Sequence, residues 1–112
     1  MKIEKYIFGM IKIGGKNYFH DIVTDGRKVE KWWRKEGHSV CLEDIEKFLK
    51  KETECVIFGT GAFGVMKVPE LIKKELKERG IEVIIEKTPS AVKNFNELVE
   101  KKKVIGFFHL TC

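Results

Sequence analysis

Three short apolar runs separated by two amphipathic segments most constrain how this chain can fold. The runs cover residues 55–58, 81–86 and 104–110. The first and the last are typical of buried strands, whereas in the second Ile81, Val83 and Ile85 alternate with Glu82, Ile84 and Glu86. Between them, apolar side chains recur at helical spacing over residues 69–80 and 88–103. This strand–helix–strand–helix–strand order predicts parallel strands joined by right-handed helical crossovers.

The first third of the chain has a different pattern, that of an antiparallel meander. Three strands are predicted over residues 7–13, 18–23 and 29–33, with a tight turn at Gly14-Gly15 after the first. A short helix over residues 42–49 then leads into the second half. Together these elements predict an α/β fold with a mixed, mainly parallel sheet and an N-terminal β-hairpin or meander.

Length and composition favour one soluble domain over residues 1–112. No apolar run reaches the roughly 20 residues of a membrane span, and the charged N-terminus is unlike a signal peptide, so we expect a cytoplasmic protein. The net charge is +5 and the chain contains no glutamine, a lysine-rich bias typical of hyperthermophiles. A heat-adapted surface therefore explains the basicity better than nucleic-acid binding does.

The cysteines and histidines do not predict a metal, a cofactor or a catalytic pair. The three cysteines lack C-x-x-C spacing, so neither a metal knuckle nor a redox pair is expected. His109 and Cys112 lie three residues apart on a predicted strand and would point to opposite faces. We therefore leave the question of enzymatic activity open, with binding as the better expectation.

A glycine-rich segment, Gly59–Gly64, follows the first apolar run and matches the pattern G-x-G-x-x-G. A dinucleotide site is not expected, because the next helix begins near Pro69 and not within the glycines. Two interpretations stay open. The glycines can permit a tight strand exit packed beneath Trp32 or Trp33. Alternatively, Gly59, Thr60 and Gly61 can line a crevice at the carboxyl ends of the strands, with free amides facing outward.

Four further residues are candidates for the rim of that crevice. Thr88 precedes Pro89 and is predicted to cap a helix that starts beside the glycines. Asn96, on the same helix, can hydrogen-bond the glycine loop or a ligand lying in it. Trp33 and Arg34 combine two residue types enriched in protein contacts, and Arg34 is also suited to clamp an anion.

The spacing of these motifs over nearly the whole chain resembles the family of small MTH-type domains. The residues that carry the likeness are Asp25-Gly26, Trp32-Trp33-Arg34, Gly37-His38, Gly59-Thr60-Gly61, Val68-Pro69, Gly80-Ile81-Glu82-Val83, Thr88, Ala91-Val92, Phe95-Asn96, Leu98 and His109-Leu110-Thr111-Cys112. The family includes the adipogenesis-associated MTH-domain protein, with mitochondrial complex I assembly factors as distant relatives. The resemblance implies a three-layer α/β/α sandwich without an established reaction, and a role in assembly or regulation through protein contacts.

We therefore expect a small assembly or adaptor protein that binds an unknown protein partner, with self-association as an open option. The alternative is a protein that binds an anionic metabolite, or an enzyme acting on one, at the glycine crevice. RNA binding is a weaker third hypothesis, and neither a membrane nor a cofactor is expected. The candidate site consists of Gly59, Thr60, Gly61, Thr88, Asn96, Trp33 and Arg34.

Overall fold

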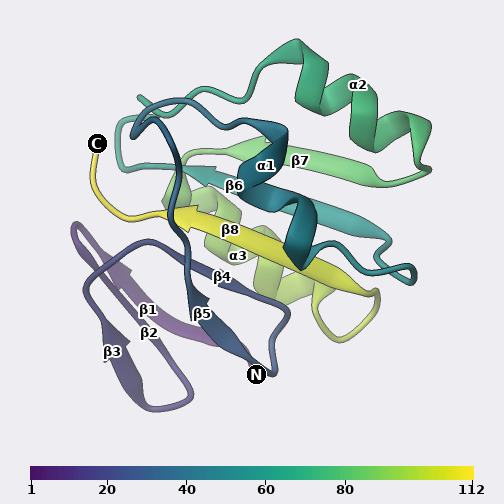
Figure 1. Cartoon of the computed structure of the whole chain (residues 1–112). Coiled ribbons are helices and arrows are strands. Elements are labelled where there is room, and N and C mark those ends of the chain that lie inside the picture. Colours follow the sequence, from purple (N-terminus) through teal and green to yellow (C-terminus); the bar gives the residue numbers. More distant parts are fainter.

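The computed structural model describes residues 1–112 and is built around a five-stranded sheet (Figure 1). The strand order is β5 (Val29–Lys31), β4 (Ile22–Thr24), β8 (Val104–His109), β6 (Cys55–Thr60) and β7 (Glu82–Glu86). β6 runs parallel to β7 and to β8, whereas β4 runs antiparallel to β8 and to β5. The central strand β8 therefore joins a parallel half of the sheet to an antiparallel half.

The prediction of parallel strands is confirmed for β6, β7 and β8, but the prediction of a mainly parallel sheet is wrong. The helices α2 (Glu70–Glu78) and α3 (Thr88–Leu98) connect the three parallel strands, as crossover connections require. β4 and β5 are instead joined by a short turn, which makes them antiparallel neighbours. Because the sheet contains both helical crossovers and a short turn between neighbouring strands, it has to be mixed.

The N-terminal strands form a separate antiparallel sheet of β1 (Ile3–Ile7), β2 (Met10–Ile13) and β3 (Lys16–Tyr18). The expected meander is therefore present, but its strand boundaries were wrong. A turn at Phe8-Gly9 interrupts the run predicted as one strand, and Gly9 adopts the positive φ of 82° that glycine tolerates. The predicted second strand is also divided, because β3 stays in the small sheet while β4 joins the large one.

Helices cover both faces of the large sheet (Figure 1). α2 and the short helix α1 (Leu42–Ile45), which continues as the 3-10 turn η1 (Glu46–Phe48), pack on one face. α3 and the small sheet pack on the other face. No helix of the chain combines the length and apolarity needed to cross a membrane.

Alternating side chains of the central strands build two separate cores. Val56, Phe58 and Phe107 face α1 and α2, whereas Ile57 and Phe108 face α3 and the small sheet. All residues of β6 and β8 are buried, because both strands are covered on both faces. These two strands form the rigid frame whose carboxyl ends position the candidate site.

Gly106, in the middle of β8, provides a test of how tightly the second core is packed. An added Cβ would lie 2.5 Å from the Phe108 ring and 2.9 Å from the Phe95 ring, so Gly106→Ala should overpack this core. We expect it to lower the free energy of unfolding by about 2 kcal/mol, measured by urea unfolding. The matched control is Gly37→Ala, where an added Cβ meets nothing within 4 Å. Equal stability of the two variants would contradict the tight packing of Phe108 and Phe95 against Gly106.

Candidate functional site

The glycine loop at the end of β6 is closed by the last two residues of the chain, Thr111 and Cys112, which we call the C-terminal strap. The Ala62 amide donates to the Thr111 carbonyl at 2.7 Å. The amides of Phe63 and Val65 both donate to the Cys112 carbonyl, at 3.3 and 3.0 Å. The expectation of free, outward-facing loop amides is therefore wrong, because the strap satisfies them from within the chain.

The glycines themselves are required by close approach of the backbone. Gly61 has a φ of 103°, and an added Cβ would lie 2.6 Å from the Cys112 carbonyl oxygen and 2.8 Å from Cδ2 of His109. At Gly59 it would lie 3.0 Å from both the Phe108 ring and the Thr88 hydroxyl. The interpretation of a tight, closely packed strand exit thus fits, but the loop packs beneath α3 and the strap and not beneath a tryptophan.

Thr88 connects three segments through one fully buried hydroxyl. Its Oγ1 accepts a hydrogen bond from the Gly61 amide at 2.8 Å and donates one to the His109 carbonyl at 2.6 Å. The prediction that Thr88 caps α3 is wrong, since Lys87 occupies the N-cap position and makes no side-chain cap. The hydroxyl instead fastens the start of α3 to the ends of β6 and β8. Thr60 adds a further bond, from its hydroxyl to the Glu86 carbonyl at 3.1 Å.

A largely buried polar cluster of Asp21, Arg34 and His109 lies beside this loop. Oδ2 of Asp21 is 2.8 Å from Nη1 of Arg34 and 2.8 Å from Nδ1 of His109. The other oxygen, Oδ1, accepts the Leu110 amide at 2.8 Å. The side chains of Arg34 and His109 are only 5% and 7% exposed. The cluster thereby links the segment before β4, the segment after β5 and the end of β8.

The contacts of Nδ1 of His109 indicate that this ring nitrogen carries a proton. This nitrogen lies 2.8 Å from Asp21 and 3.2 Å from Nη2 of Arg34. Because arginine only donates and the carboxylate only accepts, we place the proton on Nδ1, where it satisfies the shorter contact. Nε2 of His109 and Nε of Arg34 are both buried without a hydrogen-bond partner.

Arg34 is fixed in this cluster by two further contacts. Its Nη2 donates to the Gly37 carbonyl at 2.7 Å, and its guanidinium lies over the Trp32 ring, 4.5 Å from the centroid. The arginine is therefore an internal partner of Asp21 and not a cation presented to solvent. Its role in the fold is to compensate a carboxylate that would be costly to bury alone.

Two predicted site residues lie away from this cluster. Trp33 is exposed and lines a hollow together with Lys47 and Phe48, on the α1 side of the molecule. Asn96 accepts the Ile3 amide at 2.7 Å and donates to the Ile3 carbonyl at 2.9 Å, so it holds β1 against α3 and does not brace the glycine loop. It lies about 12 Å along the helix from Thr88.

The structure thus brings Gly59, Thr60, Gly61, Thr88 and Arg34 together and separates Trp33 and Asn96 from them. Sequence reasoning missed Asp21, and it considered His109 only as a partner of Cys112. Their positions in the sequence could have suggested that they meet, because Asp21 directly precedes one strand and His109 ends another.

Four exposed apolar residues lie on the two segments that hydrogen-bond the C-terminal residues, and we call them the aromatic surface: Ile7, Phe8, Phe63 and Val65. The rings of Phe8 and Phe63 lie 6.2 Å apart, with the residues 55% and 69% exposed. Both are held by the C-terminal segment, because Gly9 donates to the Leu110 carbonyl at 2.9 Å and Phe63 to that of Cys112. The aromatic surface is therefore exposed yet anchored to the core.

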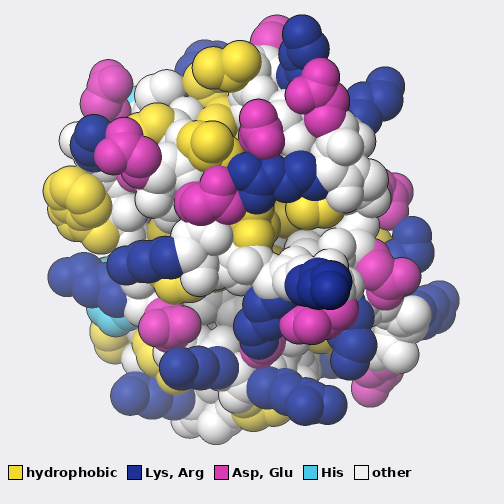
Figure 2. Space-filling model, turned by 45° about the vertical axis from the view of Figure 1, so that its right-hand side comes forward, with side chains coloured by type: hydrophobic (Ala, Val, Ile, Leu, Met, Phe, Trp, Pro, Cys, Tyr) yellow, Lys and Arg dark blue, Asp and Glu magenta, His cyan; other side chains and the backbone are white.

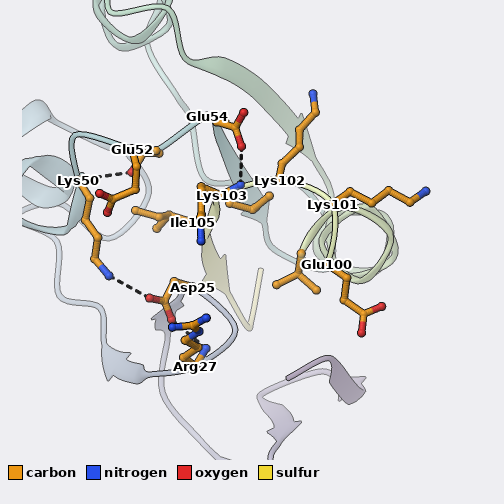
Figure 3. A pocket seen from close by; sticks show the side chains of 13 residues that line it. Asp25, Arg27, Lys50, Glu52, Glu54, Glu100, Lys101, Lys102, Lys103 and Ile105 are labelled. Atoms are coloured by element: carbon orange, nitrogen blue, oxygen red, sulfur yellow. Dashed lines mark hydrogen bonds and ion pairs between the residues drawn. The ribbon is translucent and has the colours of Figure 1, made fainter.

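A cavity of about 750 Å³ lies at the opposite end of the sheet, near the start of β6 and β8 (Figure 3). Its lining mixes lysines and an arginine with acids, and Lys50 pairs with Asp25 at 3.0 Å across it. Figure 2 likewise shows cations and acids interspersed over one face of the molecule. No group of three or more His, Cys, Asp or Glu side chains is arranged to hold a metal ion.

The fold and these motifs define a small α/β domain of the Mth938 type. The chain belongs to the family described as protein of unknown function (DUF498/DUF598), which it matches over residues 3–109. A conserved hypothetical protein from Pyrococcus horikoshii OT3 is 32% identical, with a TM-score of 0.90 and full coverage of both chains. This hyperthermophile relative agrees with the lysine-rich, glutamine-free composition.

Two further solved structures share the fold. One described as MT938 is 25% identical, with a TM-score of 0.79, covering 99% of this chain and 98% of the other. A Mth938-like domain from Bordetella pertussis is 18% identical, with a TM-score of 0.75, covering 97% of this chain and 85% of the other. These matches confirm the resemblance to MTH-type domains.

Thr88 provides a test of the hydroxyl bridge. Thr88→Val keeps the shape but leaves the Gly61 amide and the His109 carbonyl without their buried partner. We expect a loss of about 2 to 4 kcal/mol in the free energy of unfolding, measured in urea. Thr88→Ser keeps the hydroxyl and should lose about 1 kcal/mol, through the missing methyl group alone. The bridge is refuted if the serine variant is the less stable of the two.

The pH dependence of stability tests the charge on Asp21. Burial acts to raise the pKa of Asp21, but hydrogen bonds from His109 and the Leu110 amide, with a smaller one from Arg34, hold it below its ordinary value. The carboxylate therefore stabilises the fold fully above the unfolded-state pKa, near 3.9, and this contribution is lost as pH falls through the lower folded-state pKa.

We expect urea unfolding at a series of pH values to give a steeper fall in stability between about pH 5 and pH 2 for the unsubstituted chain than for Asp21→Asn. The substitution should also lower stability at pH 7, where the ionised carboxylate is replaced. Two profiles that stay parallel across this range would show that Asp21 carries no depressed pKa.

Proposed function

We propose that this domain binds another protein through the aromatic surface and acts as an assembly or adaptor factor in the cytoplasm. The observation that carries the proposal is the exposed pair of Phe8 and Phe63, which lie against each other on the surface. Clustered exposed apolar side chains mark interaction sites, and aromatic residues are enriched in the centres of protein interfaces. The resemblance to assembly factors supports the same role.

The aromatic surface is also pre-organised for binding. The turn that carries Phe8 and the loop that carries Phe63 are both hydrogen-bonded to the C-terminal segment, so little backbone order has to be gained when a partner docks. With a net charge of +5, the domain would approach an acidic partner faster than a neutral one. We therefore expect a partner that offers an apolar pocket with an acidic rim.

An anionic metabolite at the glycine loop is not part of this proposal. The amides of Ala62, Phe63 and Val65, which would have held the anion, already donate to strap carbonyls. Arg34, the nearest expected clamp, is buried against Asp21. The loop therefore offers an anion neither free donors nor an unpaired charge.

The test uses the tagged chain as bait in extract from its own host, followed by binding measurements with the purified partner. Phe8→Ser and Phe63→Ser should each weaken the measured Kd at least tenfold, which is a loss of about 1.4 kcal/mol or more. Phe19→Ser is the matched control, since Phe19 is 74% exposed but lies outside the aromatic surface. Unchanged affinity in both surface variants, or self-association as the sole interaction, would overturn the proposal.

A further inference from the structure

The strand β7 forms an open border of the five-stranded sheet. It is the last strand in the order and pairs only with β6, in continuous register from Glu82 to Glu86 (Figure 1). Its three middle residues, Val83, Ile84 and Ile85, are half-buried, whereas every residue of β6 and β8 is buried. Because α2 and α3 both contact β7, this partial exposure agrees with covered faces and an outer edge that is open to solvent.

The main chain of β7 points alternately toward β6 and away from it. The Glu82 amide donates to the Glu54 carbonyl at 3.0 Å, so every second residue from Glu82 onward bonds β6 in this parallel ladder. The amides and carbonyls of Val83 and Ile85 therefore point outward, where the chain provides no strand to pair with them. They are two donors and two acceptors in the arrangement that an added strand would bond.

The other three sheet edges of the domain are protected against such pairing. The edge strands β3 and β5 are only three residues long. In β1 the register shifts between Ile3 and Lys5, and the side chain of Asn96 bonds both the amide and the carbonyl of Ile3. Short edges, bulges and covering groups all hinder pairing with another chain. β7 has none of these three protections, and its centre is apolar.

Glutamates at the two ends of β7 restrict which chain can pair there. Glu82 and Glu86 project on the same face as Ile84, because side chains alternate along a strand. If a second copy of β7 paired antiparallel in full register, Glu82 would lie opposite Glu86 of the second copy at both ends. Like charges directly opposite each other destabilise a strand pair. A strand with a cation at each end would instead place an opposite charge beside each glutamate.

Both glutamates are available for such a contact. Glu86 is exposed and makes no ion pair. Glu82 pairs with Lys102 at 3.0 Å, but the two side chains are 51% and 43% exposed, so solvent weakens this pair. The edge therefore combines an apolar centre with an accessible negative charge at each end.

We infer that the outer edge of β7 is a docking site for an extended segment of a protein partner, with an apolar centre and a lysine or arginine at each end. The outward amides and carbonyls of Val83 and Ile85 would hydrogen-bond the main chain of this segment. Its basic ends would lie opposite Glu82 and Glu86. The edge shares no residue with the aromatic surface, so the inference goes beyond the proposed function and does not rest on it.

The experiment titrates the full chain with two pentapeptides, both acetylated and amidated, at low ionic strength, where charge pairs are screened least. The probe is Lys-Val-Ile-Val-Lys. The matched control, Glu-Val-Ile-Val-Glu, keeps the apolar centre and reverses both end charges. Amide hydrogen exchange reports the place of binding, because the amides of Val83 and Ile85 point outward whereas that of Ile84 donates to β6.

We expect saturable binding of the lysine peptide, with exchange at Val83 and Ile85 at least tenfold slower in the complex. The glutamate peptide should bind about tenfold more weakly, because two attractive cross-strand pairs are replaced by two repulsive ones. No saturable binding at millimolar lysine peptide, equal affinity of the two peptides, or binding that leaves exchange at Val83 and Ile85 unchanged would overturn the inference.

A charge-reversed variant tests the role of the glutamates. Glu82→Lys combined with Glu86→Lys keeps the outward main chain and should prefer the glutamate peptide by about tenfold. The control with the same net charge is Glu30→Lys combined with Glu36→Lys, at two exposed positions outside β7, which should still prefer the lysine peptide. Amide spectra first establish that both variants are folded. An unchanged preference in the β7 variant would refute selection by Glu82 and Glu86.

Hydrogen exchange without peptide tests whether a second copy of the chain is the occupant. We expect the exchange rates of Val83 and Ile85 to be independent of protein concentration. Exchange at these two amides that slows as the protein concentration rises would show that β7 pairs with itself, and would overturn the inference of a basic partner segment.

Discussion

The half-buried carboxylate of Asp21 ties together the segments that meet at the end of β8. It forms an ion pair with Arg34 and contacts the His109 ring and the Leu110 amide, which are neighbours at the end of β8 and lie far from Asp21 and Arg34 in the sequence. Without these donors the charge could not be kept in a site where Arg34 and His109 are almost fully buried. The carboxylate thus fixes where β8 ends, and with it the path of the C-terminal strap. The orientation of the His109 ring follows from the same contact.

A second interaction, the Thr88 hydroxyl, fastens this polar cluster to the parallel half of the sheet. The hydroxyl joins the Gly61 amide to the His109 carbonyl, so β6, β8 and α3 meet at one buried atom. The glycine loop can then approach the strap closely, because Gly61 has no side chain to obstruct it. An anion at the glycine loop would need the amides of Ala62, Phe63 and Val65. In this chain the strap has taken them, so the loop does not present them to a small anion.

Much of the fold could be predicted because its determinants are local. The apolar runs that became β6, β7 and β8 alternate with amphipathic helices, and that order alone implies parallel pairing. The N-terminal third was harder, since Phe8-Gly9 forms a turn inside a continuous apolar alternation. The candidate site was half predictable. The glycines that follow a buried strand located the loop. The residues around Thr88 do not reveal whether its hydroxyl caps a helix or bridges two strands. Likewise, the residues around Asn96 do not indicate that its side chain hydrogen-bonds Ile3.

The sequence by itself determined the strand and helix content of the second half, the buried central strands and the glycine loop at a strand end. Hydrophobic periodicity and backbone freedom are properties of neighbouring residues, so they can be recognised without knowing the fold. Only the tertiary structure decided which distant groups meet. Asp21 and His109 are separated by 88 positions, and Ile3 and Asn96 by 93. Such pairs form because the sheet order places β4 beside β8 and because a buried polar group has to find a partner wherever packing brings one within reach.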